Sequence, residues 1–221
     1  MHNLHADRKY QRHVLYHYNR FAHLYDINEW IRRGTRQKAM HLSGWRPGDR
    51  VLDLCTGTGT LASVFASQGA NVVGVDIARG MLKRASSKTK GMNTSWTEMD
   101  ATRLAFPNNC FDVAVLSLAL HHMPVAVQLS VLTELRRVTS RSVVIIEPDI
   151  PIKPRWIPIW VFVANVIDES EYMHEWVHQD FPGTCLEAGL SIQAIHGTSL
   201  GLHRIILCDP GLAESTISRK I

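Results

Sequence analysis

Residues 50–76 read RVLDLCTGTGTLASVFASQGANVVGVD and decide the expected fold. They form a short apolar strand (residues 50–54), a glycine-rich turn, a helix over residues 60–68 that ends at Gly69, and a second apolar strand over residues 71–75. Strands that are apolar throughout are typical of a parallel sheet covered by helices on both faces. The stretch therefore predicts one β-α-β unit of an open α/β fold.

The same alternation continues toward the C-terminus. The pattern predicts helices over residues 78–88, 125–138, 170–179 and 184–188, and strands over residues 94–98, 111–117 and 142–146. Two last strands, residues 191–195 and 203–208, lie close enough in sequence to form an antiparallel hairpin at one edge of the sheet. We therefore expect a Rossmann-like α/β domain with a mainly parallel seven-stranded sheet and helices on both faces.

Two decorations are expected around this domain. Residues 8–44 carry apolar positions at spacings of three and four, which predicts an N-terminal helical cap over residues 1–44. The domain itself then spans residues 45–221, with an inserted lid at about residues 151–179 that is rich in proline and aromatic side chains.

Composition excludes several classes of protein. The 221 residues are 45% hydrophobic and 20% charged, which is typical of a globular chain rather than a disordered or fibrous one. The four cysteines include no Cys-x-x-Cys pair, so neither a disulfide framework nor a thiolate zinc site is expected. Residues 1–12 are polar, and the longest apolar run, residues 156–167, is shorter than the roughly 20 residues of a membrane-spanning helix. We expect a cytoplasmic protein.

Charge is concentrated near the N-terminus. Residues 1–50 hold ten Lys and Arg against four acids, a net +6, which leaves −2 for the rest of the chain. Such a region can face nucleic acid, anionic lipid or an acidic substrate, but we interpret it chiefly as the solvated face of a helix.

The residues that carry chemistry follow the predicted strands. Asp53, Gly57 and Gly59 surround the turn after the first strand, where glycines let the backbone approach a ligand closely. Asp76 ends the second strand, where a carboxylate can bind both ribose hydroxyls, and Asp100 follows the third. The turn also fits the dinucleotide pattern G-x-G-x-x-A, so an NAD-dependent oxidoreductase is an alternative. Asp53 instead favours a ligand with a cationic ammonium group.

Three stretches resemble known motifs. Residues 51–59 (VLDLCTGTG), Val75-Asp76 with Met81, and residues 100–124 (DATRLAFPNNCFDVAVLSLALHHMP) are similar to motifs I to IV of class I S-adenosylmethionine-dependent methyltransferases. The similarity is strongest to the small-molecule branch that includes quinone-biosynthesis C-methyltransferases and bacterial phospholipid N-methyltransferases. The resemblance implies S-adenosyl-L-methionine as cofactor and a small molecule as methyl acceptor.

The resemblance also implies a role for each matching residue. Asp53 and the backbone of Gly57 and Gly59 would hold the methionine moiety, Asp76 the ribose, Ile77 or Met81 one face of the adenine, and Asp100 with Ala101 its amino edge, while Ser117 would face the methyl group. Cys55 departs from the pattern, because many relatives carry glycine there. By its position in the motif Cys55 is still counted among the cofactor-binding residues, with its thiol near the sulfonium, although we favour the interpretation of a small buried residue.

Candidates for acceptor chemistry are less defined. His121 and His122 follow the fourth strand and can exchange a proton near neutral pH, so they are catalytic candidates together with Tyr25. Residues expected to contact the acceptor are Tyr18, Glu147, Trp160, His174 and His178.

Residues 174–178 (HEWVH) match the zinc-binding pattern H-E-x-x-H. No third ligand stands at the metzincin spacing and Pro182 is expected to end the helix early, so a metalloprotease is not expected and no metal is assigned. A metal-assisted site that combines these histidines with His121 and His122 stays open. Nucleic acid is not an expected acceptor, because residues 117–120 (SLAL) lack the Asn/Asp-Pro-Pro-aromatic tetrapeptide of the amino-methyltransferases.

The expected function is therefore methyl transfer from S-adenosyl-L-methionine to a small apolar or aromatic acceptor by in-line displacement. A quinol and a lipid amine are the acceptors considered, and contact with a membrane surface and a homodimer stay open. The alternatives are a catalytically silent scaffold that binds the cofactor and, further away, the NAD-dependent oxidoreductase.

Overall fold

The computed structural model describes residues 29–149, 172–198 and 201–211 of the chain. The expected lid lies largely outside these residues, as do Tyr18, Tyr25 and Trp160. Of the expected N-terminal cap, helix α2 (Glu29–Leu42) is described. Among the described residues, none of the helices is both long and apolar enough to cross a membrane.

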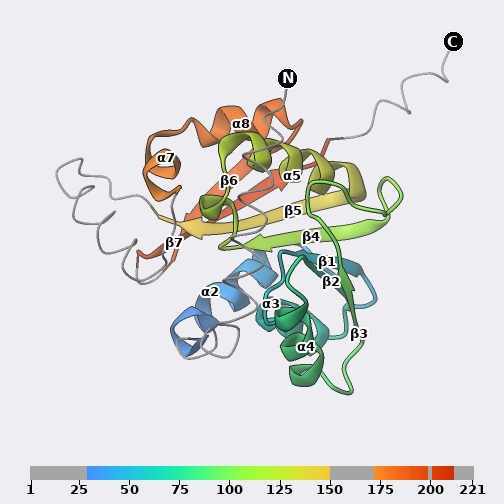
Figure 1. Ribbon diagram of the computed structural model, residues 1–221. Coiled ribbons are helices and arrows are strands. Elements are labelled where there is room, and N and C mark those ends of the chain that lie inside the picture. Colours follow the sequence, from blue (N-terminus) through green and yellow to red (C-terminus); the bar gives the residue numbers. More distant parts are fainter. Residues whose placement is uncertain (1–28, 150–171, 199–200, 212–221) are drawn as a thin grey trace, which may run out of the picture.

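One seven-stranded sheet forms the centre of the molecule, with the order β3-β2-β1-β4-β5-β7-β6 (Figure 1). Strands β1 to β5 are parallel, and β7 runs antiparallel to both of its neighbours. The expected Rossmann-like α/β fold and the edge hairpin are confirmed. The strands are β1 (Arg50–Leu54), β2 (Asn71–Asp76), β3 (Thr94–Glu98), β4 (Phe111–Ser117), β5 (Thr139–Pro148), β6 (Ser191–Gly197) and β7 (His203–Asp209).

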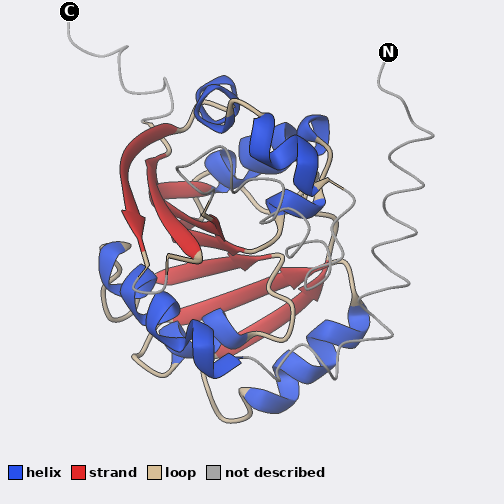
Figure 2. Cartoon of the chain, turned by 90° about the vertical axis from the view of Figure 1, so that its left-hand side faces the viewer, coloured by secondary structure: helices blue, strands red, loops and turns tan. Residues whose placement is uncertain are grey.

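Helices cover both faces of the sheet (Figure 2). Helices α2, α3 (Thr60–Ala66) and α4 (Arg79–Lys88) lie on one face, and α5 (Val125–Val138), α7 (Met173–His178) and α8 (Phe181–Glu187) lie on the other (Figure 1). Each face encloses its own apolar core. One core includes Phe65 and Ala39, and the other includes Leu132 and Trp176.

The strand order creates the place for a ligand. From β1 the chain first builds β2 and β3 on one side and then crosses to β4 and β5 on the other. The helices that follow β1 and β4 therefore diverge, which leaves a crevice at the carboxyl ends of these two neighbouring strands.

Three local features differ from the expectation. Strand β5 begins at Thr139, three residues early, because pairing with Phe111 of β4 extends it through polar residues that show no apolar pattern. A short 3-10 helix, η1 (Leu120–His122), follows β4. Pro182 does not end a helix but stands in the first turn of α8, where proline needs no hydrogen-bond partner and where Asp180 accepts a hydrogen bond from the Gly183 N–H at 3.0 Å.

Candidate functional site

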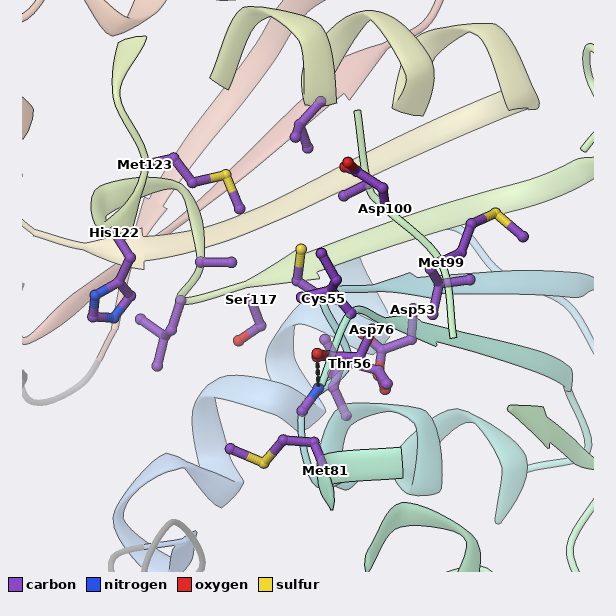
Figure 3. A pocket seen from close by; sticks show the side chains of 18 of the residues that line it. Asp53, Cys55, Thr56, Asp76, Met81, Met99, Asp100, Ser117, His122 and Met123 are labelled. Atoms are coloured by element: carbon purple, nitrogen blue, oxygen red, sulfur yellow. Dashed lines mark hydrogen bonds between the residues drawn. The ribbon is translucent and has the colours of Figure 1, made fainter. Parts of the chain in front are cut away.

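A cavity of about 330 Å³ lies at the carboxyl ends of β1, β2 and β4 (Figure 3). It is lined by the turn after β1, the end of β2, residues 99–102, residues 117–119, η1 and the neighbouring Met123, and parts of α5 and α2. Nine of the ten residues predicted to bind the cofactor line it: Asp53, Cys55, Gly57, Asp76, Ile77, Met81, Asp100, Ala101 and Ser117.

The tenth, Gly59, has a different place. It does not line the cavity, and it packs against α4 and the side chain of Trp96. A Cβ atom at Gly59 would lie 2.7 Å from the Cβ of Ala85 and 2.7 Å from Trp96, and its φ of 72° is left-handed. The glycine is therefore required for packing of the turn rather than for contact with a ligand.

Asp53 is the most enclosed carboxylate of the cavity, with 1% of its surface exposed. Its Oδ2 accepts hydrogen bonds from the Thr56 hydroxyl at 2.6 Å and from the Ala62 N–H at 2.9 Å. Burial raises the pKa of Asp53 to about 6, although these two bonds oppose the shift. Because both bonds go to Oδ2, Oδ1 has capacity left to accept from a cationic ligand.

Asp76 closes the opposite end of the glycine-rich turn. Its Oδ2 accepts a hydrogen bond from the Gly57 N–H (Figure 3) and its Oδ1 accepts one from the Ala78 N–H, each at 2.8 Å. Burial raises the pKa of Asp76, and the backbone donors oppose that shift. A carboxylate offers about four acceptor positions, so two stay available for vicinal hydroxyl groups.

The far end of the cavity combines one carboxylate with apolar side chains. Asp100 accepts hydrogen bonds at Oδ1 from the N–H and the hydroxyl of Thr102, at 2.9 and 2.8 Å. Residues that line this end and were not predicted are Met99, Thr102, Ala126, Val127, Ser130 and Val131. The last four belong to α5, whose apolar pattern predicts a helix but not which ligand its residues touch.

Cys55 lines the cavity with a left-handed φ of 55°. Burial, followed by the negative charges of Asp76, Asp53, Glu147 and Asp100, raises its pKa well above the usual value of a thiol. The thiol therefore stays neutral, which makes it a poor nucleophile.

The two candidate histidines separate in the structure. His122 lines the cavity, whereas His121 is completely buried and does not. His121 Nδ1 lies 2.5 Å from Oε2 of Glu147, which is also completely buried. The prediction that His121 contacts the substrate and that Glu147 contacts the acceptor is therefore wrong. The two side chains form a buried pair behind the cavity wall.

This pair holds the turn after β4. The N–H groups of Ala119 and Leu120 donate to Oε1 of Glu147 at 3.1 and 2.8 Å. Just before them, Leu118 has a φ of 55°, a left-handed conformation that is costly for leucine. Glu147 thus fixes the turn that presents Leu118 and His122 to the cavity.

Helix α2 contributes two arginines that the sequence analysis did not assign. Arg32 and Arg36 both line the cavity, four residues apart and so on one face of the helix. Arg36 is only 7% exposed, and its charge is among the groups that oppose the upward pKa shift of Asp53. The interpretation of these basic residues as a solvated face is therefore corrected for this pair. The sequence signal that could have identified them is their i, i+4 spacing, which places two basic side chains on one face of the helix.

The H-E-x-x-H segment lies elsewhere. His174 and His178 are exposed on α7, with ring centroids 4.7 Å apart, and neither lines the cavity. The described cavity therefore does not bring these two histidines to the place expected for the acceptor. In the described part of the chain, no group of three or more His, Cys, Asp or Glu side chains is arranged to hold a metal ion.

The fold and the site together define a Rossmann-like α/β architecture with a ligand cavity at the carboxyl ends of its parallel strands. Residues 51–142 match the family described as a methyltransferase domain. A solved SAM dependent methyltransferase from Aquifex aeolicus superimposes with a TM-score of 0.66 at 17% identity, covering 87% of this chain and 98% of that one. At this identity the likeness establishes the fold.

Two curated relatives narrow the comparison. The demethylmenaquinone methyltransferase of Beutenbergia cavernae is 38% identical over 104 residues, which is 47% of this chain and 42% of that protein. The 2-phytyl-1,4-naphtoquinone methyltransferase of Synechococcus elongatus is 29% identical over 203 residues, 80% of this chain and 85% of that protein. The resemblance to quinone-biosynthesis methyltransferases is confirmed, although the chain spans about half the length of several curated relatives that it matches.

Proposed function

We propose that this protein transfers a methyl group from S-adenosyl-L-methionine to a small apolar ring compound. The observation that carries the proposal is that Asp53 and Asp76, 23 residues apart in sequence, line one cavity and both keep acceptor capacity. An α-ammonium group and a pair of ribose hydroxyls are the donors that these carboxylates fit.

The cavity residues fit the rest of the cofactor as well. Arg36 would bind the α-carboxylate of the cofactor, because it is a buried cation whose charge acts on Asp53, the residue assigned to the neighbouring α-ammonium group. Asp100 would accept from the adenine amino group, and Met99, Val127 and Val131 would contact the ring. Three carboxylates and one arginine thus match the polar groups of this cofactor.

When bound, the cofactor would supply an electrophilic methyl group on its sulfonium, with the neutral thioether as the leaving group. The protein then has to align the acceptor and exclude water. Leu118 and Met123 contribute apolar side chains to the cavity wall beside Ser117, and His122 is the residue that we assign to receive the proton that the acceptor loses.

The acceptor class rests on the cavity wall and on the relatives. The two relatives above are named for demethylmenaquinone and 2-phytyl-1,4-naphtoquinone, both ring compounds with apolar substituents. We propose a quinol-like ring as the acceptor of this chain. A cytoplasmic location, contact with a membrane surface and a homodimer are further parts of the proposal that need separate tests.

Calorimetric titration with S-adenosylmethionine, S-adenosylhomocysteine and NADH tests cofactor choice. Both adenosyl ligands should bind, and Asp76→Ala should weaken them by about 100-fold, because charge-assisted hydrogen bonds to both ribose hydroxyls are lost. Glu98→Ala is the matched control. Glu98 lies on β3, directly opposite Asp76 of β2 in the strand register, but it does not line the cavity. Binding of NADH alone would replace the proposal by the oxidoreductase.

Turnover tests the acceptor. The protein should form S-adenosylhomocysteine when supplied with a reduced 1,4-naphthoquinone and not with phosphatidylethanolamine. Activity on the lipid amine would reverse the acceptor assignment. Tight cofactor binding without turnover on any acceptor would favour the silent scaffold.

A further inference from the structure

One charged group of the cavity has no role in the function proposed above. The side chain of Arg32 makes no hydrogen bond or ion pair with another described residue, yet Arg32 lines the cavity and is half-buried. An arginine with five donors and no side-chain partner in the described part of the chain, held at a ligand cavity, is suited to bind an anion.

The other charges can be matched to the cofactor one by one. Asp53, Asp76 and Asp100 meet its ammonium, ribose and adenine groups, and Arg36 meets its single carboxylate. This matching rests on the proposed function. It leaves one positive charge without an anionic counterpart in the cofactor.

The position of Arg32 separates it from Arg36. Four residues along α2 correspond to about 6 Å along the helix axis. Arg36 is 7% exposed and its charge acts on Asp53, whereas Arg32 is half-buried one helical turn nearer the N-terminus of α2. We therefore place Arg32 further from the methionine end of the cavity. Figure 3 shows α2 along the lower side of the cavity, across from the turn that carries His122 and Met123.

The side of the cavity that is left for the acceptor therefore holds one fixed positive charge, one histidine and apolar walls. We propose that Arg32 is an anion-binding subsite for the acceptor, which is a ring compound with an anionic oxygen, either a carboxylate or a ring hydroxyl that reacts as its oxyanion. For a ring hydroxyl, the guanidinium would also stabilise the electron-rich form that attacks the methyl group.

Matched ring ligands test this subsite on the full-length protein saturated with S-adenosylhomocysteine. The probes are 2-naphthoate and the uncharged 2-naphthamide, which has almost the same shape. A nitrophenol is added, because its absorbance reports its ionisation. Each is titrated into wild type, Arg32→Met, Arg36→Met and Arg33→Met, where Arg33 is an exposed neighbour that does not line the cavity.

We expect wild type to bind 2-naphthoate more tightly than 2-naphthamide. The affinity for 2-naphthoate should fall by about 10-fold or more in Arg32→Met and should not change in Arg33→Met. Affinity for S-adenosylhomocysteine should fall in Arg36→Met alone. A downward shift of the nitrophenol pKa on binding, lost in Arg32→Met, would identify an oxyanion as a second ligand of the subsite.

Two results would overturn the inference. If Arg32→Met weakens the binding of S-adenosylhomocysteine as much as Arg36→Met does, both arginines bind the cofactor. If 2-naphthoate shows no preference over 2-naphthamide, the cavity has no anion subsite. Failure of wild type to bind S-adenosylhomocysteine would instead contradict the proposed function itself.

Discussion

The two halves of the cavity are built in different ways. The carboxylates of the half assigned to the cofactor lie at or just after the ends of β1, β2 and β3, and each accepts a hydrogen bond from a backbone N–H of a nearby turn or helix. Arg36 of α2 and two valines of α5 complete this half. The half assigned to the acceptor combines the turn after β4, the N-terminal part of α2 and a buried carboxylate on β5.

The difference lies in what holds each half in place. Glycine-rich backbone geometry fixes the first half locally, so one turn can be recognised in one stretch of sequence. The second half depends on contacts between residues far apart, such as Ala119 and Glu147. A mutation should therefore act on the first half through backbone conformation and ligand contact, and on the second through long-range support.

The largest effect is expected for Glu147→Ala. The substitution would leave the Ala119 and Leu120 N–H groups and His121 without their buried partner, which should lower the free energy of unfolding by about 3–5 kcal/mol. Urea denaturation measures the loss. Hydrogen exchange at residues 118–122 should rise at the same time.

Glu134→Ala is the control for this change. Glu134 also accepts a backbone N–H, from Leu104, and pairs with Arg137, but the pair is partly exposed, so a loss of about 1 kcal/mol is expected. Equal losses in the two variants would mean that Glu147 does not support the turn in any special way.

A smaller loss is expected at the glycine-rich turn. Gly59→Ala brings Cβ into contact with Ala85 and Trp96 at a left-handed φ, which should cost about 2–4 kcal/mol of stability. Gly57→Ala, at a φ of 54° but with no atom within 4 Å, should cost about 1 kcal/mol. Gly57→Ala should instead weaken the binding of S-adenosylhomocysteine, because the methyl group of the new alanine would enter the cavity. Thermal melts and calorimetry separate the two effects, and the reverse pattern would contradict the assignment of Gly59.

Asp53 should make stability depend on pH. Its pKa is about 6 in the folded protein against an ordinary value of 3.8, so the folded state binds this proton more tightly than the unfolded state does. The contribution of Asp53 to stability is therefore largest below pH 4, where the carboxyl is protonated in both states. As the pH rises from about 4 through 6, the free energy of unfolding falls by up to about 3 kcal/mol.

Asp53→Asn tests that sign. The variant should be more stable than wild type at pH 8, by about 1–2 kcal/mol. Because only wild type gains up to about 3 kcal/mol on acidification, the variant should be less stable than wild type at pH 4, by about 1–2 kcal/mol. Its affinity for S-adenosylmethionine should fall, because the negative partner of the ammonium group is removed. Chemical denaturation across this range measures the first effect, with Glu98→Gln as the control for loss of a carboxylate. A variant that is less stable at pH 8 would show that the ionised form is already well compensated.

The same contrast explains what the sequence could predict. The strands Thr94–Glu98 and Phe111–Ser117 match their predicted bounds, because local apolar patterns and flanking turns define them. The residues of the glycine-rich turn and Asp76 could be grouped from spacing alone, since parallel strands bring their carboxyl ends to one edge. Their roles in binding stay predictions.

Residues whose position depends on distant contacts were not predictable in this way. Nothing local distinguishes His121, which turns toward Glu147, from His122, which lines the cavity. Arg32 and Arg36 had the spacing of one helix face, but the sequence did not show that α2 would line the cavity. Long-range packing decides these positions.

The smallest effect is expected for Cys55→Gly. A non-glycine residue at a φ of 55° costs about 1 kcal/mol, but glycine adds about 0.5–1 kcal/mol of chain entropy to the unfolded state, so the two terms nearly cancel. Cys55→Val should instead lose about 2 kcal/mol, because a β-branched side chain tolerates this conformation poorly. Urea denaturation compares the variants, and S-adenosylhomocysteine affinity should change little in Cys55→Gly. A large loss of affinity there would mean that the thiol itself contacts the ligand, and the local half of the cavity would then depend on more than backbone geometry.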